Sequence, residues 1–341
     1  MKKTLLTICL VWMCFSLSAQ KIIDLSGKWS FSIDRQDNGE KEKWFSHTLN
    51  DFINLPGSMP EKLKGDEVTA KTQWTGSLYD SSYYYNPYME KYRKEGNIKF
   101  PFFLTPDKHY VGAAWYQKEV NIPADWKGER ILLFLERPHI ETTVWVNGQK
   151  TGMQNSLCVP HQYDITRYVR PGKCTITIRV DNRIKEINVG PDSHSITDQT
   201  QGNWNGIVGR ICLQTTPKTY FDDIQIYPEP EQKLARVKVV IKGTGTAKVK
   251  LSAESFNTDK KHIVPAIQQE IKLNKGVTET EMVLPMGNDM LLWDEFHPAL
   301  YKLKAEVTNG KKTEIKEIQF GMRRFEIKGK WSVSYTHLRA H

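Results

Sequence analysis

With 341 residues, the chain is long enough for two domains that each bury a core of their own. Its hydrophobic fraction of 39% and its aromatic fraction of 11% are typical of a globular protein, which excludes a disordered chain. The formal net charge is +9, but the basic residues alternate with acidic ones instead of clustering, so no nucleic-acid-binding surface is expected.

The chain begins with MKKTLLTICLVWMCFSLSA, in which two lysines precede an apolar run from Leu5 to Leu17 and a small residue, Ala19. This pattern predicts a secretory signal peptide over residues 1–19, cleaved after Ala19, and hence a secreted or periplasmic protein. A membrane anchor is the alternative, but the run is shorter than the roughly 20 residues that span a bilayer. We therefore expect no membrane association.

Several segments after the signal peptide have the alternating or continuous apolar pattern of strands in a β-sandwich. One of them contains Asn147-Gly148, a strong signal for the type I′ turn of a β-hairpin. The segments are Ile22–Asp34, Phe52–Leu55, Ala113–Pro123, Arg130–Arg137, Glu141–Gly152 and Thr175–Arg183.

An irregular, aromatic-rich segment, Glu61 to His109, interrupts these strands. A loop of this length inside a compact domain is usually functional or an insertion. Its rings either form a rim on which a sugar stacks or pin the segment to the sandwich. For a single tyrosine, such as Tyr83, we favour the second role.

The stretch QGNWNGIVGRICL, Gln201 to Leu213, combines three glycines with an Asn-Trp-Asn cluster and leads into an apolar strand. The glycines allow a tight turn. Such a turn can hold Asn203, Trp204 and Asn205 at the rim of a sheet, where an indole face and amide groups suit the apolar face and the hydroxyls of a sugar. The alternative is an ordinary glycine-rich turn whose tryptophan caps the core.

Beyond Thr215-Thr216-Pro217 the chain changes to short apolar segments at intervals of roughly ten to fifteen residues, as in an immunoglobulin-like sandwich. They are Tyr220–Pro228, Ala235–Lys242, Ala247–Ala253, Glu270–Leu273, Glu279–Val283 and Tyr301–Thr308. Cys158, Cys174 and Cys212 follow the signal peptide at wide spacing, which implies neither a disulfide framework nor a metal cluster but leaves a single pair open.

Several of these segments resemble, in the same order, the N-terminal part of glycoside hydrolase family 2, the family of β-galactosidases, β-glucuronidases and β-mannosidases. The motifs are Leu-Ser-Gly-Lys-Trp, Trp-Val-Asn-Gly and Gly-Asn-Trp-Asn-Gly-Ile-Val-Gly-Arg. The resemblance implies an all-β fold with a jelly-roll sugar-binding domain at residues 20–218 and an immunoglobulin-like domain at 219–320. Residues 321–332 resemble the lead-in to the catalytic (β/α)8 barrel of the family.

The resemblance also implies which residues face substrate. In the family, the loop matching Gln201–Arg210 lies close to the mouth of the barrel, so Asn203, Trp204 and Asn205 are the candidates for contact with a terminal β-linked sugar. Asp198 is a weaker candidate, because the galactosidase pattern carries an acid nearby, and Arg210 is expected to form a structural ion pair. No cofactor is implied, and the oligomeric state stays open.

No catalytic residue is assigned. Retaining hydrolysis in the family uses two glutamates about 5 to 5.5 Å apart, and both belong to the barrel, which we expect to be missing here. Acidic residues that could be mistaken for them are expected to be structural or solvated, and His161, His194 and His297 lack metal-ligand spacing. The acidic residues are Glu136, Glu141, Asp294 and Glu295.

The last residues, VSYTHLRAH over 333–341, resemble a translated sequencing-library adaptor, so we expect a gene cut short and closed with non-native residues. The predicted function is the non-catalytic N-terminal part of a secreted family 2 exo-β-glycosidase, with a β-galactosidase chosen because it is the commonest activity. The alternative is a self-contained carbohydrate-binding protein without catalysis.

Overall fold

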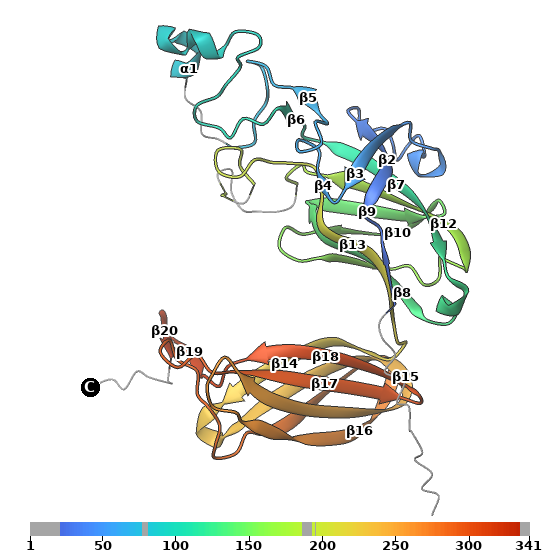
Figure 1. Cartoon of the computed structure of the whole chain (residues 1–341), viewed down its shortest axis with the longest axis vertical. Helices are drawn as coiled ribbons and strands as arrows, with labels where there is room; N and C mark the ends of the chain where they lie inside the picture. Colours follow the sequence, from blue (N-terminus) through green and yellow to red (C-terminus); the bar gives the residue numbers. More distant parts are fainter. Residues whose placement is uncertain (1–20, 77–80, 186–192, 195, 335–341) are drawn as a thin grey trace, which may run out of the picture. The chain divides into compact units, whose positions relative to one another are not determined.

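The computed structural model describes residues 21–76, 81–185, 193–194 and 196–334. They form two compact units, Lys21–Thr216 and a second unit that begins at Pro217 (Figure 1). The regular structure of both units is almost entirely β-strand, which confirms the predicted all-β fold class. The expected signal peptide, residues 1–19, and residues 335–341 of the expected tail lie outside the described part of the chain.

The first unit is a sandwich of two antiparallel sheets, with five and six strands. In sheet order, the five-stranded sheet consists of β1 (Ile22–Asp24), β13 (Gly206–Thr216), β8 (Arg130–His139) and β11 (His161–Asp164), with β4 (Gly57–Ser58) also paired to β13. The six-stranded sheet consists of β10 (Gln149–Asn155), β9 (Glu141–Val146), β12 (Gly172–Asp181), β7 (Ala113–Ile122), β2 (Gly27–Asp34) and β3 (Asp51–Leu55).

The alternation read from the sequence accounts for the core of this sandwich. Trp29 and Phe31 of β2 and Ile176 and Ile178 of β12 point inward and are fully buried, as the period-two pattern predicts. The predicted hairpin turn at Asn147-Gly148 has positive φ at both residues, 50° and 76°, as a type I′ turn requires. The strands of the sandwich thus fix the positions at which the loops that line the site begin and end.

The aromatic-rich segment between β4 and β7 contains little regular structure. It includes β5 (Asp66–Glu67), α1 (Ser82–Tyr85), the 3-10 helix η2 (Pro87–Tyr92) and β6 (Lys108–His109), with β5 paired to β6. Figure 1 shows α1 beyond the ends of the sandwich strands. The aromatic rings of the whole segment pack on one another: Phe100 stacks on Tyr83, and Trp74 stacks on Phe103. Tyr83 is buried, so this ring stabilises the segment.

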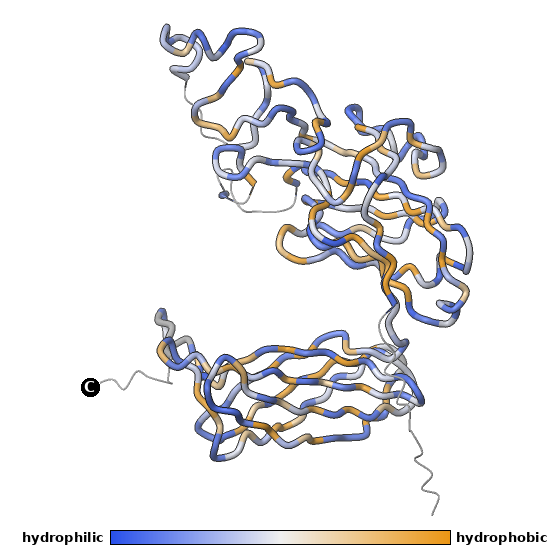
Figure 2. The backbone as a smooth tube through the Cα atoms, viewed as in Figure 1, coloured by the Kyte–Doolittle hydropathy of each residue, from blue (hydrophilic) through white to orange (hydrophobic). Residues whose placement is uncertain are grey.

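The second unit has five main strands around its own core, and hydrophobic and hydrophilic residues alternate along them (Figure 2). Two of the strands, β15 and β16, are 23 residues long, whereas the sequence predicts two separate short strands within each. The register shifts between Gly243 and Gly245, where β15 passes from pairing with β14 to pairing with β17. The strands are β14 (Tyr220–Glu229), β15 (Leu234–Phe256), β16 (Ile263–Pro285), β17 (Leu300–Asn309) and β18 (Lys312–Phe320).

The expected lead-in, residues 321–332, contains most of a small hairpin of β19 (Phe325–Lys328) and β20 (Trp331–Ser334). Val333 and Ser334, the first two residues of the expected tail, belong to β20. No helix among the described residues is long and apolar enough to cross a membrane.

Candidate functional site

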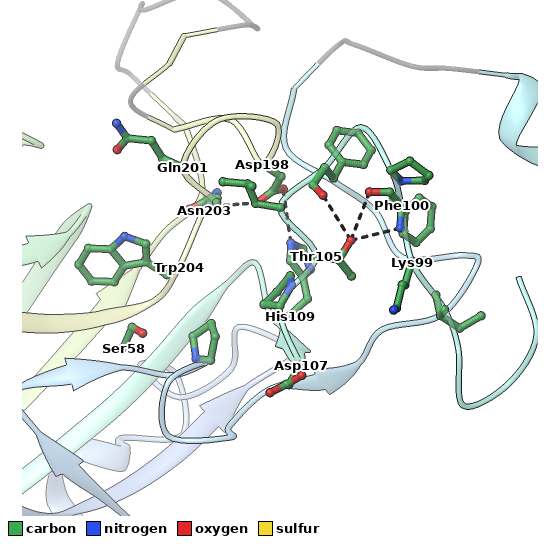
Figure 3. Close-up of a pocket in the computed structure, with 17 residues that line it drawn as sticks. Ser58, Lys99, Phe100, Thr105, Asp107, His109, Asp198, Gln201, Asn203 and Trp204 are labelled. Carbon is green, nitrogen blue, oxygen red and sulfur yellow. Dashed lines mark hydrogen bonds and ion pairs between the residues drawn. The ribbon is translucent and has the colours of Figure 1, made fainter. Parts of the chain in front are cut away.

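A pocket of about 780 Å³ lies in the first unit where three loop segments meet (Figure 3). One wall is formed by Ser58, at the end of β4, and Pro60; a second is the end of the aromatic-rich segment, Ile98–His109; and the third is the loop Asp198–Trp204 before β13. This volume falls within the range of about 300 to 1,000 Å³ that is usual for ligand pockets. Asn203, Trp204 and Asp198 therefore lie at one cavity, together with residues that the sequence did not single out.

Trp204 is half-buried, and its exposed part lines the pocket. Its indole stacks on the imidazole of His139, with ring centroids 4.6 Å apart and an angle of 22° between the ring planes. Burial lowers the pKa of His139 to about 4, so the ring is neutral at pH 7, and its Nδ1 donates to the Trp204 carbonyl oxygen at 2.7 Å. The indole is thus held at a fixed angle beside open space.

Asn203 is buried, and its amide nitrogen donates to Thr75 Oγ1 and to the Asn182 carbonyl oxygen, each at 3.0 Å. Its Oδ1 has no hydrogen-bond partner among the described residues, although it is buried and the residue lines the pocket. An unsatisfied buried acceptor is costly. A ligand hydroxyl in the pocket would supply the missing donor.

Asn205 is buried and does not line the pocket. Its Oδ1 accepts from the Tyr116 hydroxyl at 2.8 Å, and its Nδ2 donates to the carbonyl oxygens of Gly112 and Val180. These three bonds fix the start of β13 to the interior of the sandwich. The sequence grouped Asn205 with Asn203, but the structure gives it the role of anchoring the loop that carries Trp204.

Asp198 is 1% exposed and joins the loop to the aromatic-rich segment. Its carboxylate accepts from the backbone nitrogens of Thr75 at 2.6 Å and Asn203 at 2.7 Å. Its own backbone donates to the Thr75 carbonyl oxygen and accepts from the Leu104 nitrogen. His109 Nε2 lies 3.5 Å from Asp198 Oδ2 and has no hydrogen-bond partner among the described residues. Asp198 therefore positions two walls of the pocket, the loop before β13 and the aromatic-rich segment.

The expected ion pair of Arg210 is present: Arg210 Nε donates to Glu136 Oε2 at 3.1 Å on the exposed surface. Arg210 does not line the pocket. Three residues of the site were not singled out from the sequence. His109 and Lys99 line the pocket, and Thr75 forms hydrogen bonds with Asp198. A two-residue strand and isolated polar side chains carry no periodicity that could have revealed them.

Glu141 and Asp181 are buried carboxylates that share a cationic partner, so they could be mistaken for a catalytic pair. Lys185 Nζ lies 2.9 Å from Glu141 Oε1 and 2.8 Å from Asp181 Oδ2, so one ammonium group bridges the two carboxylates. Arg179 and Arg183 contact Asp181 as well.

The chemistry of this cluster opposes acid catalysis. Burial alone would raise the pKa of Asp181, but hydrogen bonds from Arg183 and Lys185 hold that pKa well below its usual value of 3.8. A general acid needs a raised pKa, and neither carboxylate lines the pocket. The cluster is structural, as expected for Glu141. Asp294, another of the four acids singled out in the sequence, accepts from the backbone nitrogens of Phe296 and His297 in an exposed turn.

No group of three or more potential metal ligands occurs among the residues that the structure describes. Cys158, Cys174 and Cys212 are all free thiols, with the last two buried. Burial raises the pKa of the Cys174 thiol to about 11, so it is inert at neutral pH.

Acidification is expected to destabilise the first unit through His139. The pKa of this ring is about 4 in the folded protein against 6.5 in the unfolded chain, so the unfolded state binds more protons between these values. The stability is complete above pH 6.5 and is lost as the pH falls towards 4, by up to about 3 kcal/mol. Denaturant unfolding from pH 7 to pH 4 checks this result, and His139→Gln should show a weaker pH dependence. Equal pH dependence in the two proteins would contradict the assignment.

Two successive β-sandwiches, the first with a pocket beside the half-buried indole of Trp204, define a two-domain all-β protein. The model of the sugar-binding domain of glycosyl hydrolases family 2 matches residues 22–217, and a second model of glycosyl hydrolases family 2 matches residues 219–323. The chain belongs to glycosyl hydrolase family 2, which confirms the resemblance read from the sequence.

Known relatives carry two different activities in their names. A β-glucuronidase of Paenibacillus borealis is 24% identical over 330 residues, which cover 91% of this chain and 46% of that protein. A β-galactosidase of Clostridium acetobutylicum is 25% identical and covers 90% of this chain and 32% of that protein. The chain thus spans less than half the length of either relative.

The solved structures agree in fold. A β-glucuronidase from Ruminococcus gnavus in complex with a C6-substituted uronic isofagomine superposes with a TM-score of 0.60 and 18% identity. The superposition covers 92% of this chain and 47% of the other. At this identity the similarity establishes the shared fold of the two sandwiches.

Proposed function

We propose that the Lys21–Thr216 unit binds a terminal β-linked sugar at the Trp204 pocket, as the non-catalytic N-terminal part of a family 2 exo-β-glycosidase. The observation that carries this proposal is the half-buried indole of Trp204 beside the unsatisfied Asn203 Oδ1. An indole face suits the apolar face of a pyranose, and the amide oxygen suits a hydroxyl. Galactoside and glucuronide are the two sugar classes that the names of the relatives support.

Replacing Trp204 by alanine is expected to weaken sugar binding about tenfold, because the stacking surface is lost. The measurement is calorimetric or NMR titration of the 341-residue protein with methyl β-D-galactoside and methyl β-D-glucuronide. Tyr88→Ala is the matched control, since Tyr88 is an exposed ring of the same unit that does not line the pocket. If neither sugar binds, or if Trp204→Ala binds as well as the wild type, the proposal fails.

Hydrolysis is proposed to belong to the whole enzyme and not to these two sandwiches. The support is chemical: the buried carboxylates of Glu141 and Asp181 are paired with cations, and the pKa of Asp181 is lowered. The purified 341-residue protein should therefore leave an aryl β-galactoside and an aryl β-glucuronide intact. Turnover of either compound at an enzyme-like rate would refute the proposal.

We also propose that the protein is exported to the periplasm or secreted. The support is the sequence pattern of residues 1–19, with two lysines, an apolar run and Ala19 before the cut. The intact mass of the protein recovered from the periplasm should correspond to a chain beginning at Gln20. Recovery of uncleaved protein from the cytoplasm alone would exclude export.

A further inference from the structure

The aromatic-rich segment packs as a body of its own beyond a narrow stem. The stem is the short strand pair of β5 and β6, and Figure 1 shows it between α1 and the strands of the sandwich. Beyond the stem, the ring of Phe100 lies with its centroid 4.6 to 6.1 Å from those of Trp74, Tyr83, Phe102 and Phe103. Among the described residues, the buried core of the sandwich includes none of these five rings. A small cluster with its own packing can open without unfolding the sandwich.

One buried carboxylate joins this body to the loop before β13. Asp198 Oδ2 accepts from the Thr75 backbone nitrogen at 2.6 Å, and the Asp198 carbonyl oxygen accepts from the Leu104 nitrogen at 2.8 Å. The other carboxylate oxygen, Oδ1, accepts from the Asn203 backbone nitrogen at 2.7 Å. Figure 3 shows Asp198 between Asn203 and the chain that carries Thr105. A single side chain therefore holds both the aromatic-rich segment and the loop that leads to Trp204.

The end of the aromatic-rich segment is also a wall of the pocket. Most residues of 98–107 line the cavity, across from Trp204 (Figure 3). If the contacts with Asp198 break, this wall moves away from Trp204 and the pocket opens to solvent. Because Asp198 also binds the backbone of Asn203, closure of the wall and placement of the Asn203 Oδ1 acceptor depend on the same group.

We infer that residues 81–107 form a lid on the Trp204 pocket, attached through the stem of β5 and β6 and held closed by Asp198. The inference rests on the proposed sugar binding for its role, which is to control entry to the pocket. A sugar that bonds to Asn203 Oδ1 favours the closed lid, and the closed lid favours the sugar, because coupling between two sites is reciprocal.

Replacing Asp198 by asparagine is expected to open the lid more often. Asparagine has an amide N–H donor in place of one carboxylate oxygen, so it loses the bond to the backbone nitrogen of either Thr75 or Asn203. Hydrogen–deuterium exchange of the sugar-free 341-residue protein, followed by mass spectrometry, measures the opening. Peptides of residues 81–107 should exchange about tenfold faster than in the wild type, as the loss of a hydrogen bond to a charged group implies. Peptides of β8 and β12 should exchange at wild-type rates.

The matched control is Asp34→Asn. Asp34 is also buried and accepts from two backbone nitrogens, those of Asn38 and Gly39, in the loop after β2. This variant should leave the exchange of residues 81–107 unchanged. The lid is overturned if Asp198→Asn exchanges there like the wild type, or if β8 and β12 are accelerated to the same degree as residues 81–107.

Thr75→Val is a milder variant for the case that Asp198→Asn does not fold. It removes only the Oγ1 that accepts from the Asn203 amide nitrogen at 3.0 Å. A smaller but measurable acceleration of residues 81–107 is expected, again without a change in β8 and β12. Unchanged exchange in this variant would then overturn the lid.

A second arm adds saturating methyl β-D-galactoside or methyl β-D-glucuronide to the wild type. The sugar that binds should slow the exchange of residues 81–107 severalfold, because it favours the closed lid. Binding without this slowing refutes the coupling between lid and site. If neither sugar binds, the proposed function fails, whereas the sugar-free comparison of variants still decides whether the lid exists.

Discussion

Replacing Asp181 by asparagine is expected to lower the free energy of unfolding of the N-terminal unit by about 3 to 5 kcal/mol. The carboxylate is fully buried and lies 3.0 Å or less from the nitrogens of Arg179, Arg183 and Lys185. Asparagine keeps the shape but removes the charge, so buried Arg179 loses one of its compensating partners. Guanidinium unfolding followed by circular dichroism measures the loss.

The matched control is Asp125→Asn, because Asp125 forms an ion pair with Lys21 on the exposed surface. Pairs of this kind contribute little to stability, so the control should unfold close to the wild type. If the two variants were destabilised to the same degree, burial of the Asp181 cluster would not be the source of its contribution. Sugar binding measured at low temperature should survive in Asp181→Asn, since the cluster does not line the pocket.

The second large effect is expected for Gly206→Ala at the start of β13. Gly206 has φ +147°, and an added Cβ would lie 2.5 Å from the Gly57 carbonyl oxygen and 2.8 Å from Ser58 Cα. These are backbone atoms of β4, so the clash cannot be relieved by rotating a side chain. We expect a loss of about 3 to 5 kcal/mol from strain and overpacking together, measured as the shift in unfolding midpoint.

Gly128→Ala separates these two causes, because Gly128 has φ +87° and nothing within 4 Å of an added Cβ. This control suffers the backbone strain alone, about 1 to 3 kcal/mol. If Gly206→Ala lowered the free energy of unfolding no more than the control does, the contact with β4 would contribute nothing to the effect. Displacement of β4 should also weaken sugar binding, since Ser58 lines the pocket.

Local patterns predicted the first domain well because each signal acts over a few residues. The period-two burial of β2 and the Asn147-Gly148 turn follow from pleat geometry and from the tolerance of positive φ. In the second domain the same reasoning predicted two short strands, Ala235–Lys242 and Ala247–Ala253, on either side of Gly243 and Gly245. The structure bends the strand there and continues it, because pairing with β16 resumes on the other side.

The site was only partly predictable, because its contacts join distant parts of the chain. Trp204 was recognised by its residue type within a glycine-rich turn. Asp198 and Thr75, however, are 123 positions apart, and nothing in their local sequence predicts the hydrogen bond between them. Asn203 and Asn205 are chemically identical and two residues apart, yet only Asn203 lines the pocket. Their roles depend on which neighbours the fold brings near.

The long strands β15 and β16 have a mechanical consequence for the C-terminal domain. Their pairing runs from Leu234 and Pro285 to Glu254 and Ile263, first beside β14 and then beside β17. The paired strands β15 and β16 therefore join the β14 side of this domain to its β17 side. Separating the β14 side of the sheet from the β17 side must disrupt β15 and β16, so we expect this domain to unfold as one cooperative unit.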